Sequence, residues 1–143
     1  MHRAPTILIV DDEDGVRQSL RRQLVAQGHS VLDAADGLQA LERIRNRLGE
    51  VDLVLADVVM PVMNGTELAA TLVVEYPDLP VILMSAYLPA GLTRVGVHQA
   101  VVPVLMKPFT SEQLEELIQV ALDLPGKDRR ASRPATSRDG PAR

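Results

Sequence analysis

The 143-residue sequence contains no cysteine and no tryptophan, and it has only one phenylalanine and two tyrosines. Without cysteine, disulfide bonds, thiolate metal sites and thiol catalysis are excluded. The shortage of aromatic side chains leaves little on which a flavin or unpaired bases could stack. The chemistry of this chain must therefore depend on other residue types.

The sequence also lacks a long hydrophobic run. No stretch reaches the roughly 18 apolar residues of a membrane span, and residues 1–5 lack the apolar core of a signal peptide. We therefore expect no membrane span and a cytoplasmic location. The length and an apolar content of 46% fit one domain with a sizeable core.

Charge is distributed unevenly along the chain. Residues 125–143 hold six basic and two acidic side chains, a net charge of +4, which leaves −8 for the preceding residues within a total of −4. The acidic body disfavours nucleic acid as a direct partner, because Lys and Arg contacts with phosphate supply most of that affinity. With few large apolar residues, residues 124–143 are predicted to be a disordered basic tail that follows a domain at 5–123.

Hydrophobic periodicity alternates between strand and helix. Short apolar runs predict buried strands at residues 6–10, 30–34, 53–56, 81–84 and 104–106. Apolar spacings of three and four predict helices at residues 14–27, 38–47 and 66–75, and a last helix from Thr110, where Gln113 completes a capping box. This alternation predicts a three-layer α/β sandwich with a five-stranded parallel sheet.

One segment breaks the alternation. A helix is expected between the fourth and fifth strands, but residues 88–103 contain Pro89, Gly91, Gly96 and Pro103 among β-branched residues. We therefore expect a fourth helix that is short, distorted or missing.

Polar residues follow four of the predicted strands. They are Asp11 and Asp12 after the first, Asp57 after the third, Ser85 after the fourth and Lys107 after the fifth. Parallel strands place their carboxyl ends at one edge, which is where open α/β sheets bind ligands. Carboxylates, a hydroxyl and an ammonium at one point indicate a site that binds a divalent cation beside a phosphoryl group.

Carboxylate oxygens are the ligands that Mg²⁺ prefers, and three carboxylates packed together need a cation or shifted pKa values to persist. Each residue also has an ordinary structural interpretation. Acidic residues at strand ends are often solvated or cap the next helix, a lone lysine usually lies at the surface, and a serine can cap a turn. The combination of four strand ends favours the binding site.

Residues 55–65, LADVVMPVMNG, closely resemble the phosphorylation loop of two-component response-regulator receiver domains. The resemblance extends to residues 7–13, 81–87 and 107–109, and covers roughly residues 5 to 123. It implies a flavodoxin-like sheet of strand order 2-1-3-4-5. It also implies that Asp11 and Asp12 hold Mg²⁺, with Asp12 the more direct ligand, and that the backbone carbonyl of Val59 completes the metal site with Asp57.

The same resemblance implies that Asp57 accepts the phosphoryl group, that the Ser85 hydroxyl binds it, and that Lys107 is the active-site lysine, joined to Pro108 by a cis peptide bond. One position departs from the family. The usual Tyr or Phe three residues before the lysine is Val104 here, which places the usual aromatic switch in question. Tyr87 could replace that aromatic, gate access to the phosphoryl group, or simply pack on the loop.

The leading functional hypothesis is a receiver that takes a phosphoryl group from a histidine kinase or a histidine phosphotransfer protein and later hydrolyses it. It would be a signalling phosphoacceptor rather than an enzyme, either as a single-domain regulator or as the receiver of a hybrid histidine kinase. The alternative is a phosphorylation-independent interaction module of the same fold. A third hypothesis is an independent enzyme, either an aspartate-nucleophile phosphatase or a flavodoxin-like redox protein. Such a phosphatase would need Asp where Val59 stands, and a flavodoxin-like protein would need more aromatic side chains than this chain has.

Overall fold

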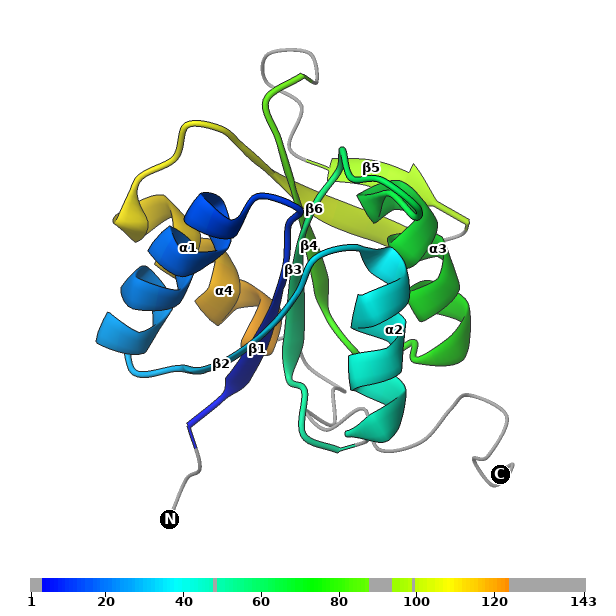
Figure 1. Cartoon of the computed structure of the whole chain (residues 1–143), viewed down its shortest axis with the longest axis horizontal. Coiled ribbons are helices and arrows are strands. Elements are labelled where there is room, and N and C mark those ends of the chain that lie inside the picture. The colour runs from blue at the N-terminus through cyan, green and yellow to red at the C-terminus, as the bar shows by residue number, and fades with distance from the viewer. Residues whose placement is uncertain (1–3, 48, 88–93, 99, 124–143) are drawn as a thin grey trace.

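The computed structural model describes residues 4–47, 49–87, 94–98 and 100–123. A central sheet has helices on both faces, as the sequence predicts (Figure 1). The elements in chain order are β1 (Thr6–Val10), α1 (Asp14–Ala26), β2 (Ser30–Ala34), α2 (Gly37–Asn46), β3 (Leu53–Asp57), α3 (Gly65–Glu75), β4 (Val81–Ser85), β5 (Arg94–Val97), β6 (Ala100–Met106) and α4 (Ser111–Leu122).

The sheet has six strands in the order β2-β1-β3-β4-β6-β5. Its five parallel strands, β2-β1-β3-β4-β6, reproduce the predicted 2-1-3-4-5 arrangement. The remaining strand, β5, lies at the edge of the sheet and is antiparallel to β6. It pairs with the first half of β6, from Arg94 opposite Pro103 to Val97 opposite Ala100. The α/β class is confirmed, and the antiparallel edge strand is an addition to it.

The additional strand comes from the segment in which a short, distorted or missing helix is predicted. Its described residues, 94–98 and 100–103, contain no helix and form β5 and the start of β6. Alternating β-branched residues such as Val95 and Val97 fit the pleat of a strand better than a helix. Residues 88–93 of the segment, and the predicted tail at 124–143, lie outside the described residues.

Two apolar clusters, one on each face of the sheet, form the core. Along β1, Leu8 and Val10 pack with α2 and α3, whereas Ile7 and Ile9 pack with α1 and α4. All five β1 residues are buried, because helices cover both faces of a parallel sheet. The apolar runs that predict strands are therefore a direct result of this double coverage.

Helix starts hold the loops at the carboxyl edge of the sheet. The predicted capping box is present in α4, where Thr110 Oγ1 accepts from Gln113 N at 3.0 Å. A second capping box, between Asn64 and Glu67, opens α3.

Among the helices of the described residues, none has the length and apolar character of a membrane span.

Candidate functional site

Three carboxylates meet at the carboxyl edge of the sheet. Asp11 and Asp12 follow β1, and Asp57 is the last residue of the neighbouring strand β3. One carboxylate oxygen from each of the three lies within 4.8 Å of the others. Asp11 is buried, Asp57 is partly buried and Asp12 is exposed. The group therefore runs from the interior to the surface, and its outer side is open to solvent.

Lys107 brings a positive charge to this group from the end of β6. Its Nζ lies 3.2 Å from Asp57 Oδ1 and 3.6 Å from Asp11 Oδ2. The backbone N–H of Lys107 donates to the carbonyl of Ser85 at 2.8 Å, which continues the pairing of β6 with β4. The peptide bond to Pro108 is cis. Lys107 thus contacts two of the three clustered carboxylates, and its single positive charge does not balance the group.

The pKa of Asp57 reflects its burial first and the neighbouring charges second. Burial raises the pKa of Asp57 above its ordinary value of 3.8, Lys107 opposes that rise, and repulsion from Asp11 and Asp12 adds to it. Burial and like charges both disfavour the ionised carboxylate. A bound cation would relieve the second of these costs.

The two oxygens of Asp11 have different surroundings. Oδ1 accepts a hydrogen bond from the Glu13 N–H at 2.9 Å. Oδ2 is buried and accepts no hydrogen bond among the described residues, and Lys107 Nζ lies 3.6 Å from it, beyond hydrogen-bond distance. A buried carboxylate oxygen without a donor is costly unless a cation compensates it. This oxygen and the all-carboxylate donor set fit a hard divalent cation.

Ser85 ends β4, the strand beside β3, and it is 2% exposed. Its Oγ accepts a hydrogen bond from the Tyr87 N–H at 3.1 Å. Val104, which stands in place of the family's aromatic, is buried in the core, whereas Tyr87 is 82% exposed. In this structure Tyr87 therefore does not occupy the interior as a substitute for that aromatic.

The loop after β3 contains Val59, which is 57% exposed. It returns to the strand at Gly65, whose N–H donates to the Val58 carbonyl at 2.9 Å. A Cβ at Gly65 would lie 2.9 Å from the carbonyl carbon of Asp57, and closer still to its oxygen. Only glycine permits this approach. Gly65 therefore supports Asp57, a role that its place in the loop motif suggests but the sequence alone does not define.

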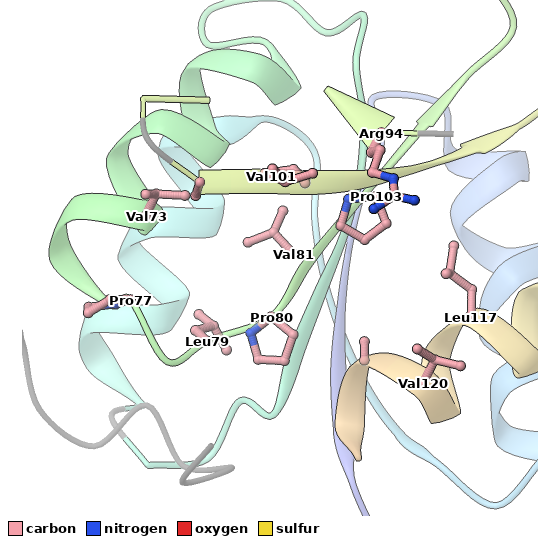
Figure 2. Close-up of a pocket in the computed structure, with 13 residues that line it drawn as sticks. Val73, Pro77, Leu79, Pro80, Val81, Arg94, Val101, Pro103, Leu117 and Val120 are labelled. Carbon is pink, nitrogen blue, oxygen red and sulfur yellow. The ribbon is translucent and has the colours of Figure 1, made fainter. Parts of the chain in front are cut away.

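A hollow of about 500 Å³ lies at the opposite end of β4 (Figure 2). It opens because β4 pairs with β6 only from Leu83 opposite Val104 onward. Its lining is mostly apolar and includes Val81, Val101 and Val120, together with Arg94. The acidic cluster lies at the other end of β4, so this hollow is not part of that site.

Comparison with known proteins identifies the family. The response regulator receiver domain family matches residues 7–119, and the chain belongs to this family. It is 39% identical over 118 residues to the sensor kinase CckA of Brucella abortus, covering 82% of this chain and 12% of that kinase. It is 36% identical over 129 residues to the response regulator MprA of a Mycobacterium species, covering 90% of this chain and 55% of MprA.

Solved structures agree with this assignment. The receiver domain of the hybrid histidine kinase CckA matches with a TM-score of 0.66 and 35% identity, covering 82% of this chain and 98% of that domain. The chemotaxis protein CheY4 of Vibrio cholerae matches with a TM-score of 0.71 and 27% identity, covering 84% of this chain and all of CheY4. The chain is thus a phosphoacceptor receiver domain of two-component signal transduction.

Proposed function

We propose that Asp57 is the phosphoacceptor, that Asp11, Asp12 and the Val59 carbonyl hold Mg²⁺ with it, and that Ser85 and Lys107 bind the phosphoryl group. The observation that carries this proposal is the meeting of Asp57 with two further carboxylates and with Lys107 Nζ at 3.2 Å. The receiver domain would span residues 5–123, followed by a basic tail at 124–143. Membership in the receiver family argues against a module that ignores phosphorylation.

The chemistry follows from the charges at the site. An oxygen of Asp57 attacks phosphorus, the phosphorus–nitrogen bond of a phosphohistidine donor breaks, and its electron pair stays with the imidazole, which takes up a proton. Lys107 offsets negative charge on the phosphoryl oxygens, and the Ser85 hydroxyl donates a hydrogen bond to one of them. When bound, Mg²⁺ supplies charge neutralisation between carboxylate and phosphoryl oxygens.

The same groups serve the dephosphorylation that completes the cycle. Water attacks phosphorus, the bond to the Asp57 oxygen breaks, and inorganic phosphate leaves with the aspartate restored. The chain therefore promotes its own phosphorylation and dephosphorylation and acts as a signalling phosphoacceptor. The chain matches a small part of a sensor kinase and the whole length of the chemotaxis protein CheY4, which is consistent with either the receiver of a hybrid kinase or a single-domain regulator.

A small phosphodonor tests this proposal without the partner. With acetyl phosphate and Mg²⁺, we expect the mass of the intact chain to increase by one phosphoryl group. With EDTA in place of Mg²⁺ the rate should fall at least about a hundredfold, because charge neutralisation is lost. Modification at the same rate in EDTA would contradict the proposed role of the metal.

The partner needs a surface beside Asp57, and the structure offers one. A groove of about 480 Å³ runs between α1 and the loop after β6, and Lys107 lines it together with the partly buried Val16 and Phe109. Because Lys107 also contacts Asp57, the groove is continuous with the site. We propose that the histidine-bearing phosphodonor protein docks here and brings its phosphohistidine to Asp57.

Replacing Val16 with glutamine should slow transfer from a phosphorylated histidine donor by about tenfold, because a polar side chain would interrupt the apolar contact. Transfer from acetyl phosphate, which needs no docking surface, should change by less than about twofold. Val25→Gln is the matched control, since Val25 is exposed on the same helix and does not line the groove. Equal slowing with both donors would contradict the docking proposal.

A further inference from the structure

Helix α1 begins differently from the other described helices. The side chains of Asp36, Asn64 and Thr110 cap α2, α3 and α4, whereas Glu13 at the start of α1 makes no side-chain cap. The loop that enters α1 is also the loop that carries the acidic pair. Other contacts must therefore hold this loop in place.

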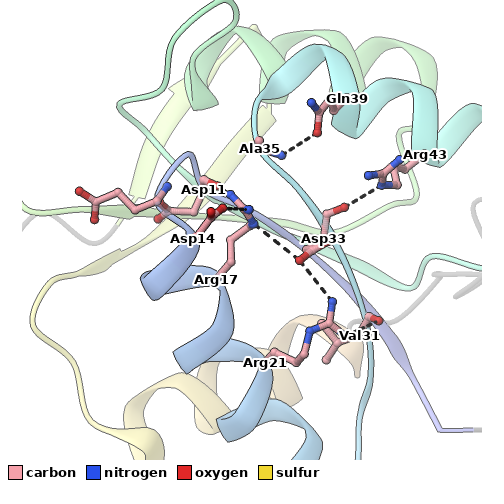
Figure 3. Close-up of polar contacts among 10 residues, drawn as sticks. Asp11, Asp14, Arg17, Arg21, Val31, Asp33, Ala35, Gln39 and Arg43 are labelled. Carbon is pink, nitrogen blue, oxygen red and sulfur yellow. Dashed lines mark hydrogen bonds and ion pairs between the residues drawn. The ribbon is translucent and has the colours of Figure 1, made fainter.

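The guanidinium of Arg17, one turn into α1, makes those contacts (Figure 3). Its Nη1 donates to the backbone carbonyl of Asp11 at 2.6 Å. Its Nη2 forms an ion pair with the carboxylate of Asp14, and its Nε lies 3.6 Å from Asp33 Oδ2. The side chain is only 13% exposed. One side chain therefore joins both ends of the loop to strand β2.

The anchor on β2 is itself held in place. Asp33 Oδ2 also lies 3.3 Å from Arg21 Nη2, one turn further along α1. Arg21 contacts β2 but not the residues of the acidic loop, since its other contact is the Val31 carbonyl at 3.4 Å. The two arginines share an anchor, and only Arg17 extends from it to the loop.

We propose that Arg17 is a positioning residue for the acidic pair, an inference that rests on the proposed function. By fixing the Asp11 carbonyl while Asp11 Oδ1 accepts from Glu13 N, Arg17 leaves Oδ2 directed toward Lys107. Together with the bond from the Asp11 N–H to the Ala34 carbonyl at 3.2 Å, it holds the backbone that carries the acidic pair in place when a divalent cation binds. Residues that hold metal ligands commonly change metal affinity by about 10- to 100-fold when replaced.

The three contacts need the shape of arginine. Its planar guanidinium offers donors at fixed positions and can serve the carbonyl and two carboxylates together, whereas lysine carries a single nitrogen on a flexible stem. Lysine at this position would preserve the charge and lose most of the contacts. The comparison of Arg17→Lys with Arg17→Met therefore separates positioning from simple charge.

Calorimetric titration of the full chain with MgCl₂ tests the proposal. Arg17→Met should raise the Mg²⁺ dissociation constant by about tenfold, and Arg17→Lys should recover less than half of that loss on a logarithmic scale. Arg21→Met, which removes a contact with the same anchor, should change it by less than about twofold. Equal weakening by Arg17→Met and Arg21→Met, or full recovery by lysine, would overturn the proposal.

Amide hydrogen exchange of the metal-free protein supplies a second readout. The Glu13 N–H, which donates to Asp11 Oδ1, should exchange about tenfold faster in Arg17→Met and at the wild-type rate in Arg21→Met. Unchanged exchange in Arg17→Met would overturn the positioning role. Failure of the wild-type chain to bind Mg²⁺ would instead contradict the proposed function, and the exchange rates would still decide whether Arg17 positions the loop.

Discussion

Replacing Asp57 with asparagine should abolish phosphorylation by acetyl phosphate or by a histidine donor, with no acyl phosphate detectable by intact mass. The amide keeps the shape of the carboxylate but removes the anionic oxygen that attacks phosphorus. Asp11 Oδ2 lies 3.6 Å from Lys107 Nζ in the wild-type chain, so the lysine should keep a partner in the variant. The expected loss is therefore chemical and does not require the site to collapse.

Glu13→Gln is the matched control for this result. Glu13 belongs to the same acidic run, but its side chain is exposed and it is not among the three clustered carboxylates. We expect the control to be phosphorylated at the wild-type rate within about twofold. If Asp57→Asn were modified as readily as Glu13→Gln, Asp57 would not be the acceptor.

Asp57→Asn should also change how the free energy of unfolding depends on pH. Because the pKa of Asp57 is raised on folding, the folded protein holds its proton more tightly than the unfolded chain. Ionisation therefore lowers the free energy of unfolding as the pH rises from the ordinary value of 3.8 through the raised value. In metal-free buffer at neutral pH, Asp57→Asn should melt at a higher temperature than wild type, and this difference should vanish in acid below the ordinary value.

The second large effect is expected from Gly65→Ala. The added Cβ would meet the backbone of Asp57, and the end of β3 would have to move because a carbonyl cannot rotate away as a flexible side chain can. Overpacking of this kind costs about 1–3 kcal/mol of unfolding free energy. Displacement of a reacting group by about 1 Å can lower a rate about a hundredfold. We expect phosphorylation by acetyl phosphate to slow by an amount of that order.

Gly96→Ala is the control for a glycine far from the site. A Cβ at Gly96 has no atom within 4 Å among the described residues. Both the rate of phosphorylation by acetyl phosphate and the urea concentration at the midpoint of unfolding should therefore stay close to wild type. If Gly65→Ala gave wild-type values in both measurements, the close approach of Gly65 to Asp57 would not be a constraint on the site.

Local patterns predict most of this fold because the sheet is covered on both faces. Runs such as the one in β1 are apolar throughout, and the helices show their buried faces at regular spacings. Strand β5 cannot be predicted from local patterns, because its formation depends on pairing with β6 rather than on local periodicity. His29 is another example: it is buried, and its Nε2 lies 2.9 Å from Glu115 of α4, a partner far from it in the sequence.

The site can be predicted where its residues end strands. Asp11, Asp57 and Lys107 follow apolar runs, and parallel topology then brings them to one edge. The supporting residues follow no such rule. Arg17 reads as one more charge on an amphipathic helix, and only the packing of α1 against β2 shows that its guanidinium reaches the Asp11 carbonyl. Supporting contacts of this kind depend on tertiary geometry rather than on sequence spacing.

The most direct measurement is to locate the phosphoryl group itself. The wild-type chain, phosphorylated by acetyl phosphate with Mg²⁺, is reduced with borohydride, which converts an aspartyl phosphate to homoserine, and is then sequenced by tandem mass spectrometry. We predict homoserine at Asp57 and at no other position. Homoserine at Asp11 or Asp12, with Asp57 intact, would contradict the assignment of the phosphoacceptor.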